Sequence, residues 1–254
     1  MTKLQSKFLD TLTEFGYDIF NLQMIRDTNY FSDKEITQAL RTLTKSGILI
    51  KLEQGKYVKK GFSDEFVIGN FLAPDGGIAY WSALNFHGLT EQFPNVIYIQ
   101  TAKRSGILTY NNLRYKFIKV NSRKLLGYKI QGYGNHSYKI TDIEKTLVDC
   151  FDLPKHAGWY HETVKAFNNA KINARKLTKY CKAINNNSVT KRLGFLCELI
   201  QKPNTQYFID YAQTCVKDEY ALFEISGNKT GVYNKRWKLI LNLSENEIVE
   251  ISKS

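Results

Sequence analysis

The chain of 254 residues is long enough for two domains of ordinary size, and its 43% hydrophobic composition supports buried cores. Its formal net charge of +12 favours a polyanionic partner. No run reaches the roughly 18 consecutive apolar residues of a membrane-spanning helix, and the charged, amphipathic start of the chain is unlike a signal peptide. These features argue against a membrane protein and predict a cytoplasmic one.

Residues 1 to 60 contain three short helical patterns. A stripe of large apolar residues between residues 4 and 15 predicts a first helix. Residues 20 to 28 are long enough for a second. The third is expected to begin at Ser32, because Ser32 and Glu35 have the spacing of a capping box, in which each side chain satisfies a free backbone N–H at the helix start.

The third helix has one apolar face and one face of long hydrogen-bond donors. Ile36, Leu40 and Leu43 recur at three- and four-residue steps and form the predicted buried face. A helix that reads a nucleic-acid groove needs such donors on its free face. The alternative is an ordinary solvated face. The donors are Lys34, Gln38, Arg41 and Lys45.

Two lysine-bearing strands are predicted directly after this helix. Residues 48 to 52 and 56 to 60 are strand-like and flank a glycine-containing turn. Together with the three helices they predict a winged helix-turn-helix domain over residues 1 to 60 that binds nucleic acid, or alternatively docks a protein. The residues expected at its interface are Lys34, Gln38, Arg41, Thr42, Lys45, Lys51, Lys56, Lys59 and Lys60.

Residues 61 to 254 are expected to form a larger domain that carries most of the positive charge. Residues 1 to 60 hold ten Lys/Arg against seven Asp/Glu. Beyond them, two long tracts lack Asp and Glu altogether: residues 92 to 141 with nine Lys/Arg, and residues 163 to 197 with eight. These tracts predict a positive surface that attracts nucleic acid or an acidic protein. The alternative is that the lysines only solubilise the protein.

Hydrophobic patterns in the larger domain predict a short sheet followed by helices. The predicted fold class is α+β, with a winged helix-turn-helix domain followed by a mixed α/β domain over residues 61 to 254. A buried helix is expected at residues 78 to 84, strands at 96 to 100, 114 to 120 and 127 to 133, helices from Thr141 and near 160 to 170, 174 to 185, 188 to 201 and 205 to 216, and closing strands near 219 to 225 and 236 to 242.

One acidic cluster would suit a metal-dependent nuclease. Asp142, Glu144, Lys145 and Asp149 contain the right residue types, but their spacing fits the first turns of a helix, with a capping box starting at Thr141. The histidines and cysteines lack metal-ligand spacing, and no glycine pair is followed by a phosphate-binding lysine and serine. We therefore expect no catalytic residue, metal or cofactor. A nuclease or nucleotide-handling enzyme targeted by the winged helix is the alternative.

Several segments in linear order give the chain a family resemblance. The chain resembles the AbiEi family of antitoxins over nearly its whole length. The segments that carry the resemblance are YWSALNFHGLTEQ at residues 80 to 92, PNV at 94 to 96, TAKR at 101 to 104, DIEKTLVDC at 142 to 150, KRLGFLCEL at 191 to 199 and YNKRW at 233 to 237.

The resemblance implies an antitoxin and transcriptional autorepressor of a type IV toxin–antitoxin phage-defence operon. It implies that the promoter DNA of that operon is bound at inverted repeats, and that a nucleotidyltransferase toxin is opposed without a stable complex. The third helix would then lie in the major groove with Gln38 and Arg41 at base edges, and the lysines of the hairpin would lie against phosphates. A further alternative is that the positive tracts bind RNA and protect the toxin's substrate. The expected antitoxin face is Lys103, Arg104, Lys191 and Arg192.

Overall fold

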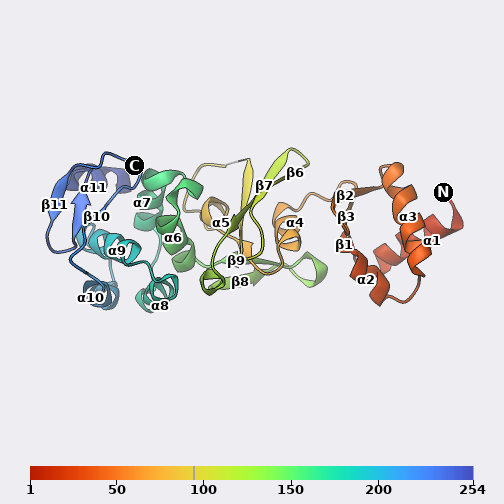
Figure 1. Cartoon of the computed structure of the whole chain (residues 1–254), viewed down its shortest axis with the longest axis horizontal. Helices are drawn as coiled ribbons and strands as arrows, with labels where there is room; N and C mark the ends of the chain where they lie inside the picture. The colour runs from red at the N-terminus through yellow and green to blue at the C-terminus, as the bar shows by residue number, and fades with distance from the viewer. Residues whose placement is uncertain (94, 254) are drawn as a thin grey trace.

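The structure is a computed structural model that describes residues 1–93 and 95–253. Figure 1 shows an elongated, mixed α+β chain whose elements form three parts in series: an N-terminal group of helices with a small sheet, a central sheet, and a C-terminal group of helices. The N-terminus lies at one end of the long axis, and the C-terminus lies in the opposite half of the molecule.

The N-terminal part packs three helices on one face of a three-stranded sheet of order β1-β3-β2, with both pairings antiparallel. Phe8, Leu12, Ile36 and Leu43 are among the buried residues of its core. The elements in chain order are α1 (Lys3–Glu14), β1 (Ile19–Asn21), α2 (Leu22–Asp27), α3 (Asp33–Lys45), β2 (Leu49–Glu53) and β3 (Lys56–Lys59).

The predicted start of α3 is confirmed, whereas the predicted second helix is partly wrong. Ser32 Oγ accepts a hydrogen bond from Glu35 N, and the Glu35 carboxylate accepts one from Ser32 N at 2.8 Å. Residues 19–21, in contrast, form β1 and pair with β3, and α2 begins only at Leu22. A partner about forty positions along the chain decides this strand, which no local pattern reveals.

The central part is one six-stranded mixed sheet of order β6-β7-β5-β4-β9-β8. The β5–β7 and β4–β9 pairs are parallel, and the others are antiparallel. The three predicted strands are found as β5 (Val96–Thr101), β7 (Leu113–Lys119) and β8 (Tyr128–Gln131). Not predicted were β4 (Gly77–Ile78), β6 (Gly106–Tyr110) and β9 (Tyr138–Thr141); the helices of this part are α4 (Glu65–Leu72) and α5 (Tyr80–Phe86).

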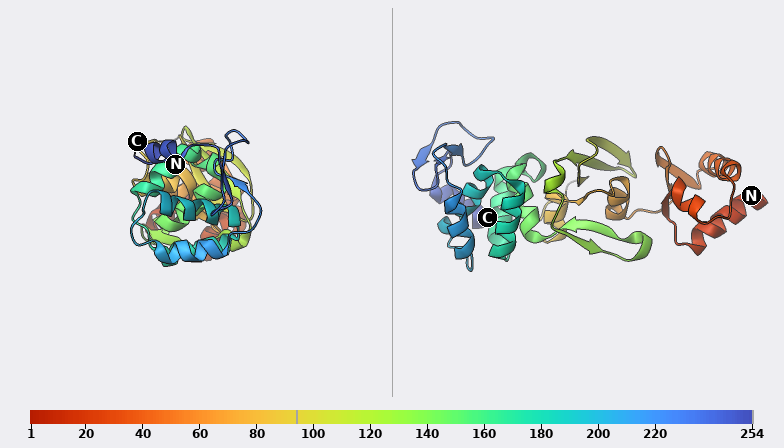
Figure 2. Two further views of the ribbon diagram at one scale, coloured as in Figure 1. Left: turned by 90° about the vertical axis from the view of Figure 1, so that its left-hand side faces the viewer. Right: turned by 60° about the horizontal axis from the view of Figure 1, so that its bottom comes forward.

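The C-terminal part is mainly helical and closes with a second small sheet of order β10-β12-β11. Its core includes Leu147, Phe151, Leu193 and Trp237. The elements are α6 (Ile143–Asp152), α7 (Trp159–Asn169), α8 (Ala174–Ile184), α9 (Asn187–Leu199), α10 (Gln206–Thr214), β10 (Ala221–Leu222), β11 (Val232–Asn234), β12 (Leu239–Leu241) and α11 (Glu245–Lys253). Figure 2 shows these helices gathered at the end opposite the N-terminal part.

The N-terminal part is fixed to the central part by a shared apolar core. Ile19 and Val58, on the face of the small sheet that points away from its own helices, belong to the same buried cluster as Ile68 and Leu72 of α4. Polar contacts surround this cluster. Asn135 Nδ2 donates to the Phe15 carbonyl at 2.7 Å across the same junction. The position of α3 is therefore tied to the central sheet.

A glycine inside α9 lets the helix pack directly against the ring of Trp237. A Cβ built on Gly194 would lie 2.3 Å from the ring of Trp237, whereas one built on Gly69 of α4 would meet the flexible ends of Ile78 and Ile99 at 3.2 Å or more. We predict that Gly194→Ala lowers stability by about 1–3 kcal/mol despite the better helix propensity of alanine. Thermal unfolding measures this.

Gly69→Ala is the matched control, since it also introduces alanine into a helix. It should leave the melting temperature nearly unchanged, because the isoleucine methyl groups can move by the few tenths of an ångström required. A Gly194→Ala protein as stable as the parent would contradict the packing described.

Candidate nucleic-acid interface

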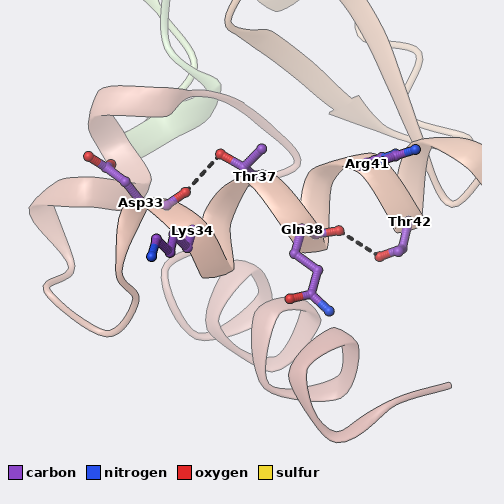
Figure 3. Close-up of a pocket in the computed structure, with 6 residues that line it drawn as sticks. All are labelled: Asp33, Lys34, Thr37, Gln38, Arg41 and Thr42. Carbon is purple, nitrogen blue, oxygen red and sulfur yellow. Dashed lines mark hydrogen bonds between the residues drawn. The ribbon is translucent and has the colours of Figure 1, made fainter.

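The exposed face of α3 carries the predicted row of donors. Lys34, Gln38, Arg41 and Lys45 are all exposed, while Ile36 and its apolar neighbours are buried as predicted. None of the four side chains forms a hydrogen bond or ion pair with another residue in the described ranges. Figure 3 shows Lys34, Gln38 and Arg41 along the same helix. The row is therefore free to meet a ligand.

Thr42 differs from the rest of the predicted interface. Its hydroxyl donates to the Gln38 carbonyl at 2.9 Å and lies 3.0 Å from the Ala39 carbonyl, within its own helix. Thr37 bonds back to the Asp33 carbonyl at 2.7 Å in the same way (Figure 3). Both hydroxyls already have a partner, so Thr42 offers its methyl group rather than a hydrogen-bond donor.

A groove separates α3 from the β2–β3 hairpin. It has a volume of about 570 Å³ and is lined by Arg41 and Lys45 of α3 together with Lys51 of β2 and Gln54 of the hairpin turn. Three cations thus line a single open groove beside the exposed helix. Their combined charge makes the electrostatic potential of the groove positive.

The hairpin lysines do not all face solvent to the same extent, and two of them already have partners within the protein. Lys51 and Lys60 are exposed. Lys56 instead donates to the Phe71 and Leu72 carbonyls at the end of α4 at 3.2 and 3.0 Å. Lys59 pairs with Asp18 at 3.1 Å. Both lysines are therefore engaged in contacts within the protein: Lys56 with the end of α4, and Lys59 with Asp18.

The predicted antitoxin face is not a single surface. Lys191 and Arg192 are 3% and 4% exposed. Lys191 Nζ donates to the carbonyls of Glu219 and Lys238, and Arg192 Nε donates to the Leu222 carbonyl at 2.9 Å. Burial lowers the pKa of both side chains. The prediction is wrong for this pair, whose role is to hold the chain around β10 against α9.

Arg104 also serves the fold, whereas its neighbour Lys103 is exposed. The guanidinium of Arg104 lies 3.9 Å from the centroid of the Phe117 ring and pairs with Glu53 of β2. Glu53 pairs in addition with Lys56 at 2.9 Å. Arg104 is therefore part of the junction between the N-terminal and central parts, and of the four residues predicted for the antitoxin face only Lys103 is free.

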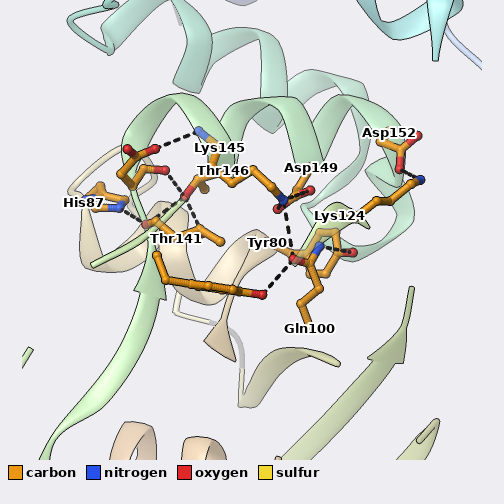
Figure 4. A network of polar contacts seen from close by, with 11 residues as sticks. Tyr80, His87, Gln100, Lys124, Thr141, Lys145, Thr146, Asp149 and Asp152 are labelled. Carbon is orange, nitrogen blue, oxygen red and sulfur yellow. Dashed lines mark hydrogen bonds and ion pairs between the residues drawn. The ribbon is translucent and has the colours of Figure 1, made fainter. Parts of the chain in front are cut away.

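The acidic cluster of α6 is buried, and its groups are bound to one another and to neighbouring elements. Asp142, rather than Thr141, caps the helix by accepting from Lys145 N at 3.0 Å, so the predicted capping box is wrong by one residue. The Glu144 carboxylate accepts instead from Asn173 N at 2.8 Å. Lys145 and Asp149 form an ion pair that is almost fully buried below α6 (Figure 4).

This network connects α6 to the central sheet and to α8. Lys145 Nζ also lies 3.4 Å from Gln100 Oε1 of β5, and Tyr180 of α8 donates its hydroxyl hydrogen to Asp142 at 2.8 Å. No group of three His, Cys, Asp or Glu side chains within residues 1–93 and 95–253 has an arrangement that could hold a metal ion. In the same ranges, no helix is both long and apolar enough to cross a membrane.

Comparisons with known proteins find a solved structure with a similar fold. No protein-family model and no curated protein matches this chain. Among solved structures, the crystal structure of the RV2827C protein from Mycobacterium tuberculosis is similar, with a TM-score of 0.67 and 14% sequence identity over 100% of this chain and 96% of that one. At this identity the likeness shows the fold alone, and it extends along the entire chain.

The contacts of Glu53 predict a pH-dependent junction. Burial raises the pKa of Glu53, but hydrogen bonds from Lys56 and Arg104 outweigh this effect and hold the pKa below its ordinary value of 4.5. The stabilisation from ionised Glu53 is therefore complete above pH 4.5 and is lost as the pH falls through the folded-state pKa. Glu53→Gln should lower the melting temperature at neutral pH, and the difference from the parent should shrink below that value.

Thermal unfolding of both proteins from about pH 3 to pH 8 measures this dependence. Glu250→Gln is the control, because Glu250 is exposed on α11, far from the junction. It should change stability by less than about 0.5 kcal/mol at any pH. A Glu53→Gln difference that stays constant across the range would contradict the assignment.

Proposed function

We propose that this protein is a transcriptional autorepressor and antitoxin, in which residues 1 to 60 act as a winged helix-turn-helix that binds the promoter DNA of its own operon. The proposal rests first on the exposed row of Lys34, Gln38, Arg41 and Lys45, whose side chains bind no other part of the described chain. The order of three helices and a small sheet, with a hairpin beside the last helix, agrees with this proposal.

The chemistry of the row suits a DNA duplex. Gln38 and Arg41 are about one helical turn apart and can make paired hydrogen bonds to adenine and guanine edges in the major groove. Lys45 and Lys51 line the adjoining groove, and Lys34 and Lys60 are exposed. These four lysines are assigned to phosphates.

The antitoxin role rests on the resemblance to the AbiEi family, whose motifs mostly build the core of this fold. The segments around Lys145, Arg192 and Trp237 all build the C-terminal core and its connection to the central sheet. They support a shared scaffold rather than an exposed site. We propose a nucleotidyltransferase toxin as the functional partner, opposed without a stable complex, with Lys103 as the remaining exposed cation of the proposed face.

The DNA-binding role predicts a charge- and residue-specific reduction of affinity. Gln38→Ala with Arg41→Ala should weaken binding to the DNA upstream of the gene by about 2–6 kcal/mol and should erase most of the preference over unrelated duplex. Lys45→Ala with Lys51→Ala should weaken both duplexes equally. The second change should also lower the slope of log affinity against log salt by about 0.9 for each phosphate that the protein no longer neutralises.

Fluorescence anisotropy with both duplexes over a range of salt concentrations measures these effects. The control is Lys229→Ala with Lys235→Ala, which removes two positive charges from the C-terminal part, as Lys45→Ala with Lys51→Ala does from the proposed interface. If the control weakens binding as much as the α3 substitutions do, or if affinity does not change with salt, the interface is wrongly assigned.

The antitoxin role predicts rescue of growth that is separable from DNA binding. The intact chain, and equally its Gln38→Ala/Arg41→Ala variant, should restore growth to cells that express the nucleotidyltransferase toxin of the proposed operon. Lys103→Ala should reduce the rescue, because it removes the exposed cation of the proposed face. Colony counts with and without each variant give the readout, at protein levels matched by blotting. Failure of every form to rescue would leave only the regulatory role.

A further inference from the structure

The second acid-free tract presents its charge on α8, because Lys191 and Arg192 are buried. Arg175, Lys179 and Lys182 are exposed or partly exposed and follow one another at steps of four and three residues, so they form one stripe along the helix. The opposite face of α8, which includes Leu177, Cys181 and Ile184, is buried in the C-terminal core. The orientation of α8 is therefore fixed by its apolar face.

The stripe is not neutralised by the protein. Lys176 of the same helix points elsewhere and pairs with Asp142 at 3.0 Å. Arg175, Lys179 and Lys182 have no carboxylate within ion-pair distance in the ranges that the structure describes. Three uncompensated cations on one short helix attract a polyanion.

Tyrosine rings from α10 lie beside two of these cations. The Arg175 guanidinium carbon is 5.5 Å from the centroid of Tyr207, and Lys182 Nζ is 5.0 Å from the centroid of Tyr211. Tyr207 is 54% exposed. Guanidinium planes and exposed rings are the groups on which unpaired bases stack. The surface therefore offers sites for bases as well as for phosphates.

We infer that α8 and α10 together bind single-stranded RNA. The two helices pack side by side, and a pair of packed helices is too broad for the major groove of about 12 Å that admits a single helix. A flexible strand can instead follow the stripe with its phosphates and place bases on Tyr207. RNA is the form in which unpaired, unstacked bases are commonly recognised in this way.

This surface is separate from the proposed DNA interface. Figure 1 places α8 and α10 at the end of the molecule opposite α3, and the right-hand view in Figure 2 agrees with that separation. Asp210 is an exposed carboxylate on α10 that accepts from Gln206 Nε2 at 2.8 Å. The RNA strand would have to pass this charge, so Asp210→Asn is expected to strengthen binding.

The test uses the full chain carrying Lys34→Ala, Gln38→Ala, Arg41→Ala and Lys45→Ala, so that the exposed row of α3 does not contribute. Labelled oligouridine is the probe, with oligothymidine of equal length, duplex RNA and heparin as competitors. Arg175→Ala/Lys179→Ala/Lys182→Ala should weaken binding at least tenfold and should lower the salt slope by about 2, at about 0.7 per neutralised phosphate. These side chains lie outside the buried face of α8, and an unchanged melting temperature verifies the fold.

Tyr207→Ala and Tyr207→Phe separate stacking from charge. The alanine variant should bind roughly tenfold more weakly because the stacking ring is removed, whereas the phenylalanine variant should keep the affinity of the parent. The inference would be overturned if the triple charge variant bound the probe as tightly as the parent does. It would also be overturned if Tyr207→Ala had no effect and heparin competed fully. Tighter binding of oligothymidine would assign the surface to single-stranded DNA and overturn the choice of RNA, and tighter binding of duplex RNA would overturn the single-strand assignment.

Discussion

The junction between the small N-terminal sheet and α4 determines how the whole molecule is arranged. A sheet that covers helices on one face would ordinarily expose its other face to water, but here that face carries Ile19 and Val58 and is buried against α4. The Lys56 ammonium binds the carbonyls at the carboxyl end of α4, where backbone dipoles favour a cation. Residues 1 to 60 are thus anchored by apolar burial, by Lys56 at the end of α4 and by the Arg104–Glu53 ion pair.

Local patterns predict those parts of the fold that are decided locally. The start of α3 was predictable because Ser32 and Glu35 satisfy backbone groups within one turn, and its buried face followed from the helical period. The strands β1 and β4 were not predictable, since each is only two or three residues long and is stabilised by strands far away in the sequence. Short strands carry too few residues for alternation to be visible.

The residues of the candidate site divide in the same way, into those whose exposure is decided locally and those whose burial depends on distant partners. Lys34, Gln38, Arg41 and Lys45 were predicted correctly as exposed, because a helical period separates a polar face from an apolar one. Charge counting failed for Lys191 and Arg192, since a tract without carboxylates can still bury cations against backbone carbonyls. The prediction for Arg104 failed for a related reason, because its acidic partner Glu53 lies in another part of the chain. Burial and distant partners are absent from a one-dimensional charge pattern.

The rigid junction has a geometric consequence for chains bound side by side. Because α3 is tied to the central sheet, DNA binding through α3 as proposed would make the long body of the chain project from the duplex in one fixed direction. Two chains on sites a whole number of helical turns apart, about 10.5 base pairs each, would project on the same side of the duplex. Chains offset by half a turn would project on opposite sides. Helical phase would then decide whether neighbouring bodies can touch.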